Sequence, residues 1–139
     1  MEAKRILVAV RPRTNQIISD ALASEFALTF CSSMASAQLA LDDSIDLIIC
    51  GMHFDDGRMF DLLQYAKTNP KTRSIPFLCI KSNQGIVPIR AIKSVELASY
   101  VLGSDGFIEM YKWRRQFGDE EAYKKLRDIV RRLTSMAKR

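Results

Sequence analysis

Five short apolar runs, separated by segments of helical periodicity, constrain the fold of this chain more than any other feature. The first run, RILVAV, is apolar at every position after the arginine and rich in branched side chains, which is typical of a strand buried on both faces. The runs are RILVAV (5–10), ALTFCS (27–32), IDLIICGM (45–52), IPFLCIKS (75–82) and FIEM (107–110). The segments that follow them place apolar residues three and four positions apart, which predicts helices.

The expected helices cover 14–26, 32–43, 57–67, 89–102 and a final stretch that begins at residue 119. Thr14 caps the first of them and Ser32 or Ser33 the second, because short hydroxyl side chains accept hydrogen bonds from the free N–H groups of a first turn. Asp119 is the expected N-cap of the last helix. Two stretches are expected to be a loop and a basic linker, respectively: NQGIVP (83–88) and YKWRRQFG (111–118).

Strands that alternate with helices indicate an α/β fold, in which a parallel sheet is covered by helices on both faces. Right-handed crossovers leave few topologies, and the flavodoxin-like strand order 2-1-3-4-5 is the natural one. In such folds, function concentrates in the loops after the carboxyl ends of the strands. Those loops begin near Val10, Gly51, Lys81 and Met110. We expect one domain, residues 1–139.

The cysteines and the single histidine argue against disulfide and metal chemistry. Cys31, Cys50 and Cys79 each lie in an apolar stretch, none in a CxxC pair, so we expect buried, reduced thiols in a cytoplasmic protein. Zinc needs about four ligands, which His53 does not supply, and no metal or cofactor is expected. No apolar run approaches the roughly 18 residues that span a bilayer, so no membrane contact is expected.

Four stretches together resemble the receiver domain of two-component response regulators, the CheY-like family. They are KRILVAV, IDLIICGMHFDDGRMFDLLQYAK, SIPFLCIK and LGSDGFIEM. The resemblance covers roughly residues 4–110 and continues through the last helix. It implies a signalling domain that accepts a phosphoryl group on an aspartate. In that family an acidic pair holds Mg²⁺, while a Ser/Thr hydroxyl and a lysine read the phosphoryl group.

The residues at the matching positions depart from the family's pattern. In chain order they are Val10 and Arg11 for the acidic pair, Gly51 for the acceptor, Lys81 for the hydroxyl and Met110 for the lysine. Glycine has no side chain to phosphorylate, and valine cannot ligate a hard cation. We therefore expect a degenerate pseudo-receiver. It would not be an enzyme, but a phosphorylation-independent signalling or protein-interaction module.

Polar residues near these positions leave alternatives open. Asp55 and Asp56 are candidates for displaced metal ligands or acceptors, but two loop carboxylates without a third ligand make a poor Mg²⁺ site, which favours a solvated acidic turn. Arg11 and Lys81 either pair internally with these aspartates, bind an anion or a partner's carboxylate, or are ordinary surface charges. His53 is interpreted as a loop side chain.

The basic excess lies at the C-terminal end. Residues 1–110 carry 11 Lys+Arg and 12 Asp+Glu, whereas residues 111–139 carry 10 and 4. The candidate interaction face comprises Tyr111, Lys112, Trp113, Arg114, Arg115, Lys124, Arg127 and Arg131. It is either a solvated basic helix face or a docking surface for a protein partner or a second copy of the chain. Nucleic-acid binding is a less favoured alternative because no base-recognition motif accompanies the charge, and a small-molecule α/β domain is a third.

Overall fold

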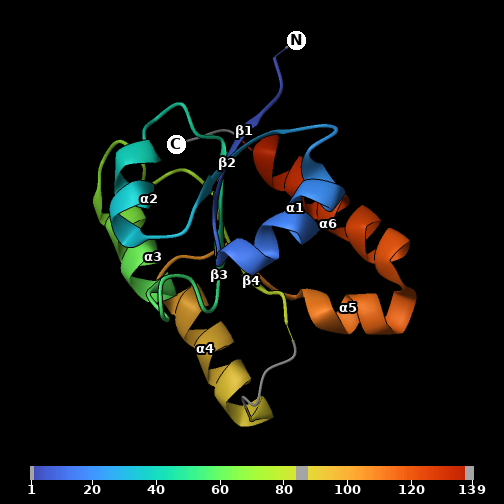
Figure 1. Ribbon diagram of the computed structural model, residues 1–139. Helices are drawn as coiled ribbons and strands as arrows, with labels where there is room; N and C mark the ends of the chain where they lie inside the picture. The colour runs from blue at the N-terminus through green and yellow to red at the C-terminus, as the bar shows by residue number, and fades with distance from the viewer. Residues whose placement is uncertain (1, 84–87, 137–139) are drawn as a thin grey trace.

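The computed structural model describes residues 2–83 and 88–136, and its centre is a five-stranded parallel sheet (Figure 1). The strands are β1 (Arg5–Ala9), β2 (Ala27–Cys31), β3 (Leu47–Gly51), β4 (Phe77–Lys81) and β5 (Gly106–Glu109). Their order across the sheet is β2-β1-β3-β4-β5, and every neighbouring pair is parallel. The predicted α/β fold and strand order are confirmed.

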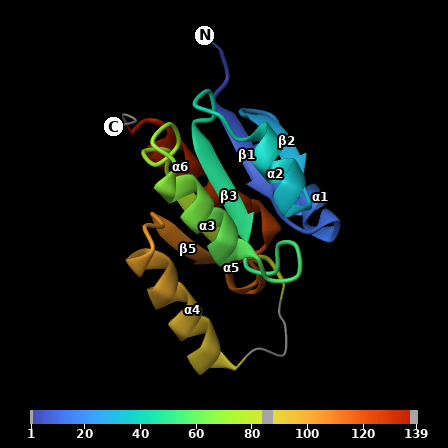
Figure 2. The same cartoon turned by 90° about the vertical axis from the view of Figure 1, so that its left-hand side faces the viewer.

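Helices cover both faces of this sheet. After a short 3-10 helix at Pro12–Thr14 come α1 (Asn15–Leu22), α2 (Met34–Ala40), α3 (Met59–Thr68), α4 (Ile89–Val101), α5 (Met110–Phe117) and α6 (Asp119–Thr134). One face carries α1, α5 and α6, and the other carries α2, α3 and α4 (Figure 1). Figure 2 shows α3 lying over the sheet with α2 and α4 on either side.

The alternation of side chains in β3 explains its unbroken apolar run. Leu47 and Ile49 belong to the core cluster under α1 and α6, whereas Ile48 and Cys50 belong to the cluster under α2 and α3. A strand covered on both faces has no solvent side on which a polar residue is favoured. The strand ends with Gly51 lying beside Val10, which follows β1.

The predicted linker at 111–118 is wrong, because the segment forms helix α5. Met110 is fully buried at its first position and Trp113, one turn later, packs against the same core cluster. Gly118, with a φ of 84°, separates α5 from α6 in a backbone conformation that favours glycine. A short amphipathic helix, rather than a connecting stretch, therefore leads into the last helix.

Two of the expected helix caps also differ. Gly118 holds the N-cap position of α6 and Asp119 is its first residue, with a carboxylate engaged by Arg114 rather than by the helix's own N–H groups. Thr14 precedes α1 as expected, but its hydroxyl contacts Ser82 at 3.0 Å and makes no capping bond. Ser33, and not Ser32, caps α2 through a reciprocal capping box with Ser36.

The cysteines agree with expectation, since Cys31, Cys50 and Cys79 are buried free thiols. Burial raises the pKa of the Cys79 thiol to about 12, which keeps it protonated at neutral pH. Within the described residues, no helix combines the length and apolar character that crossing a membrane requires. Of the predicted loop at 83–88, residues 84–87 lie outside the described part of the chain.

Candidate functional site

The carboxyl ends of β1, β3 and β4 meet around a small pocket. It is lined by Val10, Arg11, Thr14, Gly51, Met52, His53, Phe54, Ile80 and Ser82. Its volume is about 10 Å³, which is about the space that one water molecule occupies. The pocket thus lies where ligands bind in open parallel sheets, and three of the five positions predicted from the resemblance line it.

Gly51 has room for a side chain, and the atoms nearest to that position belong to Val10. A Cβ built on Gly51 would meet Cγ1 of Val10 at 3.4 Å, an ordinary van der Waals distance. A side chain at this position would therefore extend beside valine methyl groups rather than beside carboxylate oxygens. Met110, the fifth matched position, is fully buried in the core under α6 and does not line the pocket.

The side chain of Lys81 is buried, and its ammonium contacts groups inside the protein. Only 1% of the residue is exposed, its ammonium donates a hydrogen bond to the Asn83 carbonyl, and it lies 5.0 Å from the centre of the Tyr111 ring. Burial lowers the pKa of Lys81, an effect opposed by Glu109 and reinforced by Arg11. Its side chain therefore joins the end of β4 to the start of α5.

The internal pairing offered as one alternative does not form. Among the described residues, no ion pair joins Arg11 or Lys81 to Asp55 or Asp56. Both aspartates have positive φ, 45° and 56°, in a turn that leads the chain towards α3. The Asp55 carboxylate instead accepts a hydrogen bond of 2.8 Å from the backbone N–H of Met34, at the start of α2, where the helix dipole favours negative charge.

The polar groups that do face the pocket are hydrogen-bond donors and a cation. Arg11 and His53 are half-buried there, and the Thr14 and Ser82 hydroxyls lie 3.0 Å apart. Burial lowers the pKa of His53, and so do the positive charges of Arg11 and Lys81. Sequence reasoning missed Thr14 and Ser82, although the position of Ser82 directly after a buried strand was an available signal.

These groups do not fit a magnesium ion, which takes carboxylate and other oxygen ligands in an octahedral arrangement. The pocket lining contains no carboxylate, and a guanidinium opposes a cation electrostatically. Nor does any group of three or more His, Cys, Asp or Glu side chains suited to a metal occur among residues 2–83 and 88–136.

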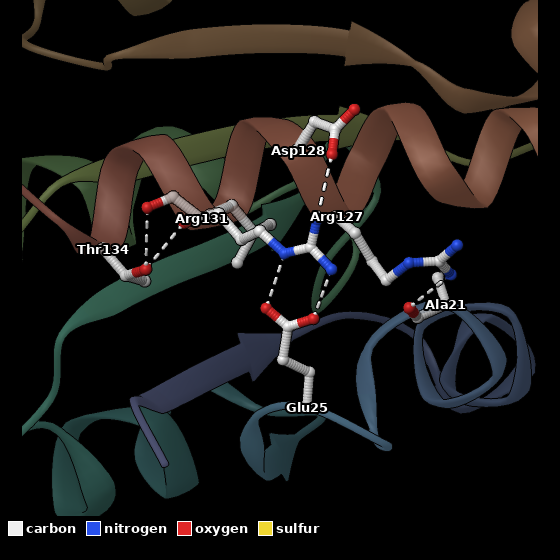
Figure 3. A network of polar contacts seen from close by, with 7 residues as sticks. Ala21, Glu25, Arg127, Asp128, Arg131 and Thr134 are labelled. Atoms are coloured by element: carbon white, nitrogen blue, oxygen red, sulfur yellow. Dashed lines mark hydrogen bonds and ion pairs between the residues drawn. The ribbon is translucent and has the colours of Figure 1, made fainter. Parts of the chain in front are cut away.

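The predicted C-terminal interaction face is largely a set of internal contacts. Arg131 binds the Glu25 carboxylate through two bonds of 2.7 and 2.6 Å and contacts Asp128 at 3.2 Å, as Figure 3 shows. Arg127 donates to the Ala21 carbonyl at 3.2 Å. We call these contacts of Arg127 and Arg131 the α6 latch, because they hold α6 against α1 and the turn after it.

Most of the other members of the predicted face also contact residues of the same chain. Trp113 packs against the core, and Arg114 binds both carboxylate oxygens of Asp119, at 2.8 and 3.3 Å. The Tyr111 hydroxyl donates to Glu109 at 3.1 Å, and the Lys112 ammonium contacts the same carboxylate at 3.1 Å. The exposed basic side chains of the face are Lys112, Arg115, Lys124 and Arg131, of which Lys112 and Arg131 also contact carboxylates.

Helix α4 presents exposed apolar side chains that sequence reasoning missed. Ile89 and Leu97 are each 66% exposed, Val101 is 79% exposed and Tyr100 is 44% exposed. Ile89, Leu97 and Val101 are eight and four residues apart and lie away from the inner face on which Ile92 is buried. Isolated exposed leucines are normal, but several on one helix mark a candidate contact surface.

Comparison with solved structures identifies the fold. The phosphorylated cyanobacterial phytochrome response regulator RcpA matches with a TM-score of 0.70 at 16% sequence identity, over 98% of this chain and 97% of its own. The chain has the receiver fold. The non-phosphorylated HemR receiver domain from Leptospira biflexa, also at 0.70, is 19% identical over 98% of both chains.

A third solved structure that resembles this chain contains a bound magnesium ion. The receiver domain of a sensor histidine kinase from Pseudomonas aeruginosa, with a magnesium ion in its active-site cleft, matches with a TM-score of 0.70. It is 14% identical, over 97% of this chain and all of that one. No model of a known protein family and no curated protein sequence matches this chain. The assignment of the receiver fold therefore rests on structural similarity at low sequence identity.

Proposed function

We propose that this protein is a phosphorylation-independent interaction module built on the receiver fold, without phosphotransfer activity. The observation that carries the proposal is the lining of the pocket at the ends of β1, β3 and β4. Gly51 and Val10 stand side by side there, and no carboxylate lines the pocket.

The chemistry of phosphoryl transfer supports this proposal. An acceptor must supply a nucleophilic oxygen, and a metal ion must offset the charge that develops on the phosphoryl oxygens. Gly51 supplies no side chain, and Arg11 is a cation. Asp55, the nearest candidate for a displaced acceptor, is bound to the N-terminus of α2. The lysine of active receivers is replaced by Met110, whose side chain lies in the core.

Beryllium fluoride provides a test, because it mimics a phosphoryl group on a carboxylate in the presence of Mg²⁺. We expect ¹⁹F NMR to show only free fluoride species when the protein is mixed with beryllium, fluoride and Mg²⁺. A phosphorylatable receiver domain serves as the positive control. A Mg²⁺-dependent bound signal that disappears when Asp55 is changed to Asn would overturn the proposal and identify the displaced acceptor.

We further propose that the docking surface for a protein partner, or for a second copy of the chain, lies on α4 and α5 rather than on the latched arginines of α6. The exposed apolar positions of α4 supply contact area, and α5 exposes Lys112, whose ammonium also contacts Glu109. Nucleic-acid binding is less favoured, because Arg114, Arg127 and Arg131 are engaged in internal contacts.

A pair of matched variants tests this surface. Leu97→Glu places a charge on α4, and Leu39→Glu places one on α2, where Leu39 is 90% exposed. We expect only Leu97→Glu to weaken self-association in light scattering, or capture of a partner once one is known. Equal effects of the two variants would remove α4 from the proposal. Binding to DNA or RNA that weakens steeply with salt would favour the nucleic-acid alternative.

A further inference from the structure

The pocket at the ends of β1, β3 and β4 concentrates positive charge without a matching carboxylate. Arg11 lines it directly, and both Arg11 and the neighbouring Lys81 act on His53 strongly enough to lower its pKa, after the larger effect of burial. Glu109 faces Lys81 from β5 but is bound to Tyr111 and Lys112. The carboxylate of Asp55 is held by α2. Repulsion among these cations is therefore a cost that a bound anion would relieve.

The pocket also offers neutral hydrogen-bond donors in fixed positions. The Thr14 and Ser82 hydroxyls lie 3.0 Å apart, and Thr14 is only 2% exposed. When one hydroxyl donates to the other, the second still has its own proton to donate. The pair therefore presents one hydroxyl donor to the pocket that Arg11 and Gly51 also line.

We propose that this pocket reversibly binds a small tetrahedral oxyanion, with the Arg11 guanidinium and the Thr14–Ser82 hydroxyl pair as the donors. Arg11 forms no ion pair among the described residues, so its planar donor group is available for two-point contact with oxygen atoms. No covalent step is involved. The protein would hold as a ligand the chemical group that it cannot accept covalently.

The size of the pocket sets the strength of this binding. A volume of about 10 Å³ admits a single oxygen, so the rest of the anion lies at the open mouth, in contact with water. Arg11 is only half-buried, which further weakens the charge interaction. We expect a dissociation constant on the order of millimolar, the range of a ligand held by few contacts.

The single histidine makes the test direct, because His53 lines the pocket and gives the only imidazole signals of the chain. The protein is titrated with inorganic phosphate at constant ionic strength, sodium chloride being withdrawn as phosphate is added, and the His53 ring resonances are followed by NMR. We expect a saturable displacement. Equal displacement by chloride, or a displacement that never saturates, would overturn the proposal.

Matched variants separate the site from a general effect of charge. Arg11→Gln should abolish saturation, whereas Arg13→Gln, which removes an exposed cation two residues away, should leave it unchanged. Thr14→Val should raise the half-saturating concentration several-fold. If Arg11→Gln binds phosphate as well as the wild type does, the site is not the one proposed. Arg11 is half-exposed, so this variant should fold even if the one at buried Thr14 does not.

A second titration, with phosphoserine, distinguishes two sources of the anion. A lower half-saturating concentration for phosphoserine than for phosphate favours a phosphorylated side chain of a partner as the ligand. Equal half-saturating concentrations favour the free anion, and either result supports the site. The inference uses the pocket of the proposed function but stands apart from it. Covalent transfer and reversible binding have separate readouts, so one can fail without the other.

Discussion

Placing a lysine at position 110, as the receiver pattern has it, should lower the free energy of unfolding by a large amount rather than create a function. Met110 is fully buried, in the core cluster that α6 covers. Met110→Lys loses the transfer free energy of a buried methionine, about 1.5–3 kcal/mol. It also desolvates an ammonium, which costs several kcal/mol unless the side chain reaches solvent. Because the long lysine side chain can bring its ammonium partly towards solvent, which reduces the second cost, we expect a total loss of about 3–5 kcal/mol.

Met110→Leu is the matched control, because it keeps the volume and the apolar character of the site. It should cost less than about 1.5 kcal/mol. Since small domains are stable by about 5–15 kcal/mol, the lysine variant should still fold, with a much lower urea midpoint. Trp113 is the only tryptophan and packs against the same cluster, so its fluorescence reports the unfolding of this region.

The pH dependence gives an independent check on the cause. Burial lowers the pKa of a lysine in the folded state below its unfolded value of about 10.4. Between these two values the unfolded state binds more protons, so stability rises with pH. The deficit of Met110→Lys relative to Met110→Leu should therefore shrink as the pH is raised towards that value. A lysine variant within about 0.5 kcal/mol of the wild type at neutral pH would refute the assignment of this position to the core.

Three further predictions concern the pocket and the α6 latch. Gly51→Asp alone should take up no phosphoryl group from a small donor in intact-mass measurements, because the neighbouring valine and arginine leave the new carboxylate without a metal site; an adduct would show that one substitution suffices. Arg11→Gln should raise the pKa of His53, followed by NMR, since it removes a cation that lowers it; an unchanged value would place the guanidinium farther away. Arg131 lowers the pKa of Glu25, so Glu25→Gln should reduce stability above the ordinary carboxyl value of about 4.5. That difference from the wild type should vanish as the pH falls through the lowered folded value, and a loss that persists in acid would contradict the latch.

Strands β1, β3 and β4, at the centre of the sheet, could be predicted because they are buried on both faces. Such a strand reads as an unbroken apolar run, as in residues 47–50, whatever packs against it. Helix α5 could not be predicted in the same way. Its inward positions, Met110 and Trp113, are followed by two arginines, and its eight residues are too few for a helix to form without tertiary contacts.

The site was only partly accessible from the sequence. The resemblance predicts Val10, Arg11 and Gly51 at one site, and the three line one pocket in the structure, because the carboxyl ends of parallel strands meet at one edge. It did not show that Lys81 turns to Tyr111 and Asn83. Nor could it show that Arg131 forms an ion pair with Glu25, since that contact joins residues 106 positions apart and depends on the packing of α6.

The central claim is that the receiver fold of this protein has no phosphoacceptor, and incubation with acetyl phosphate and Mg²⁺ tests it most directly. Intact-mass spectrometry, performed on the native protein beside a phosphorylatable receiver, reports any covalent gain. We predict that the mass of this protein stays unchanged while that of the control rises by one phosphoryl group. A stoichiometric, Mg²⁺-dependent gain in this protein, mapped by fragmentation to any aspartate, would contradict the account.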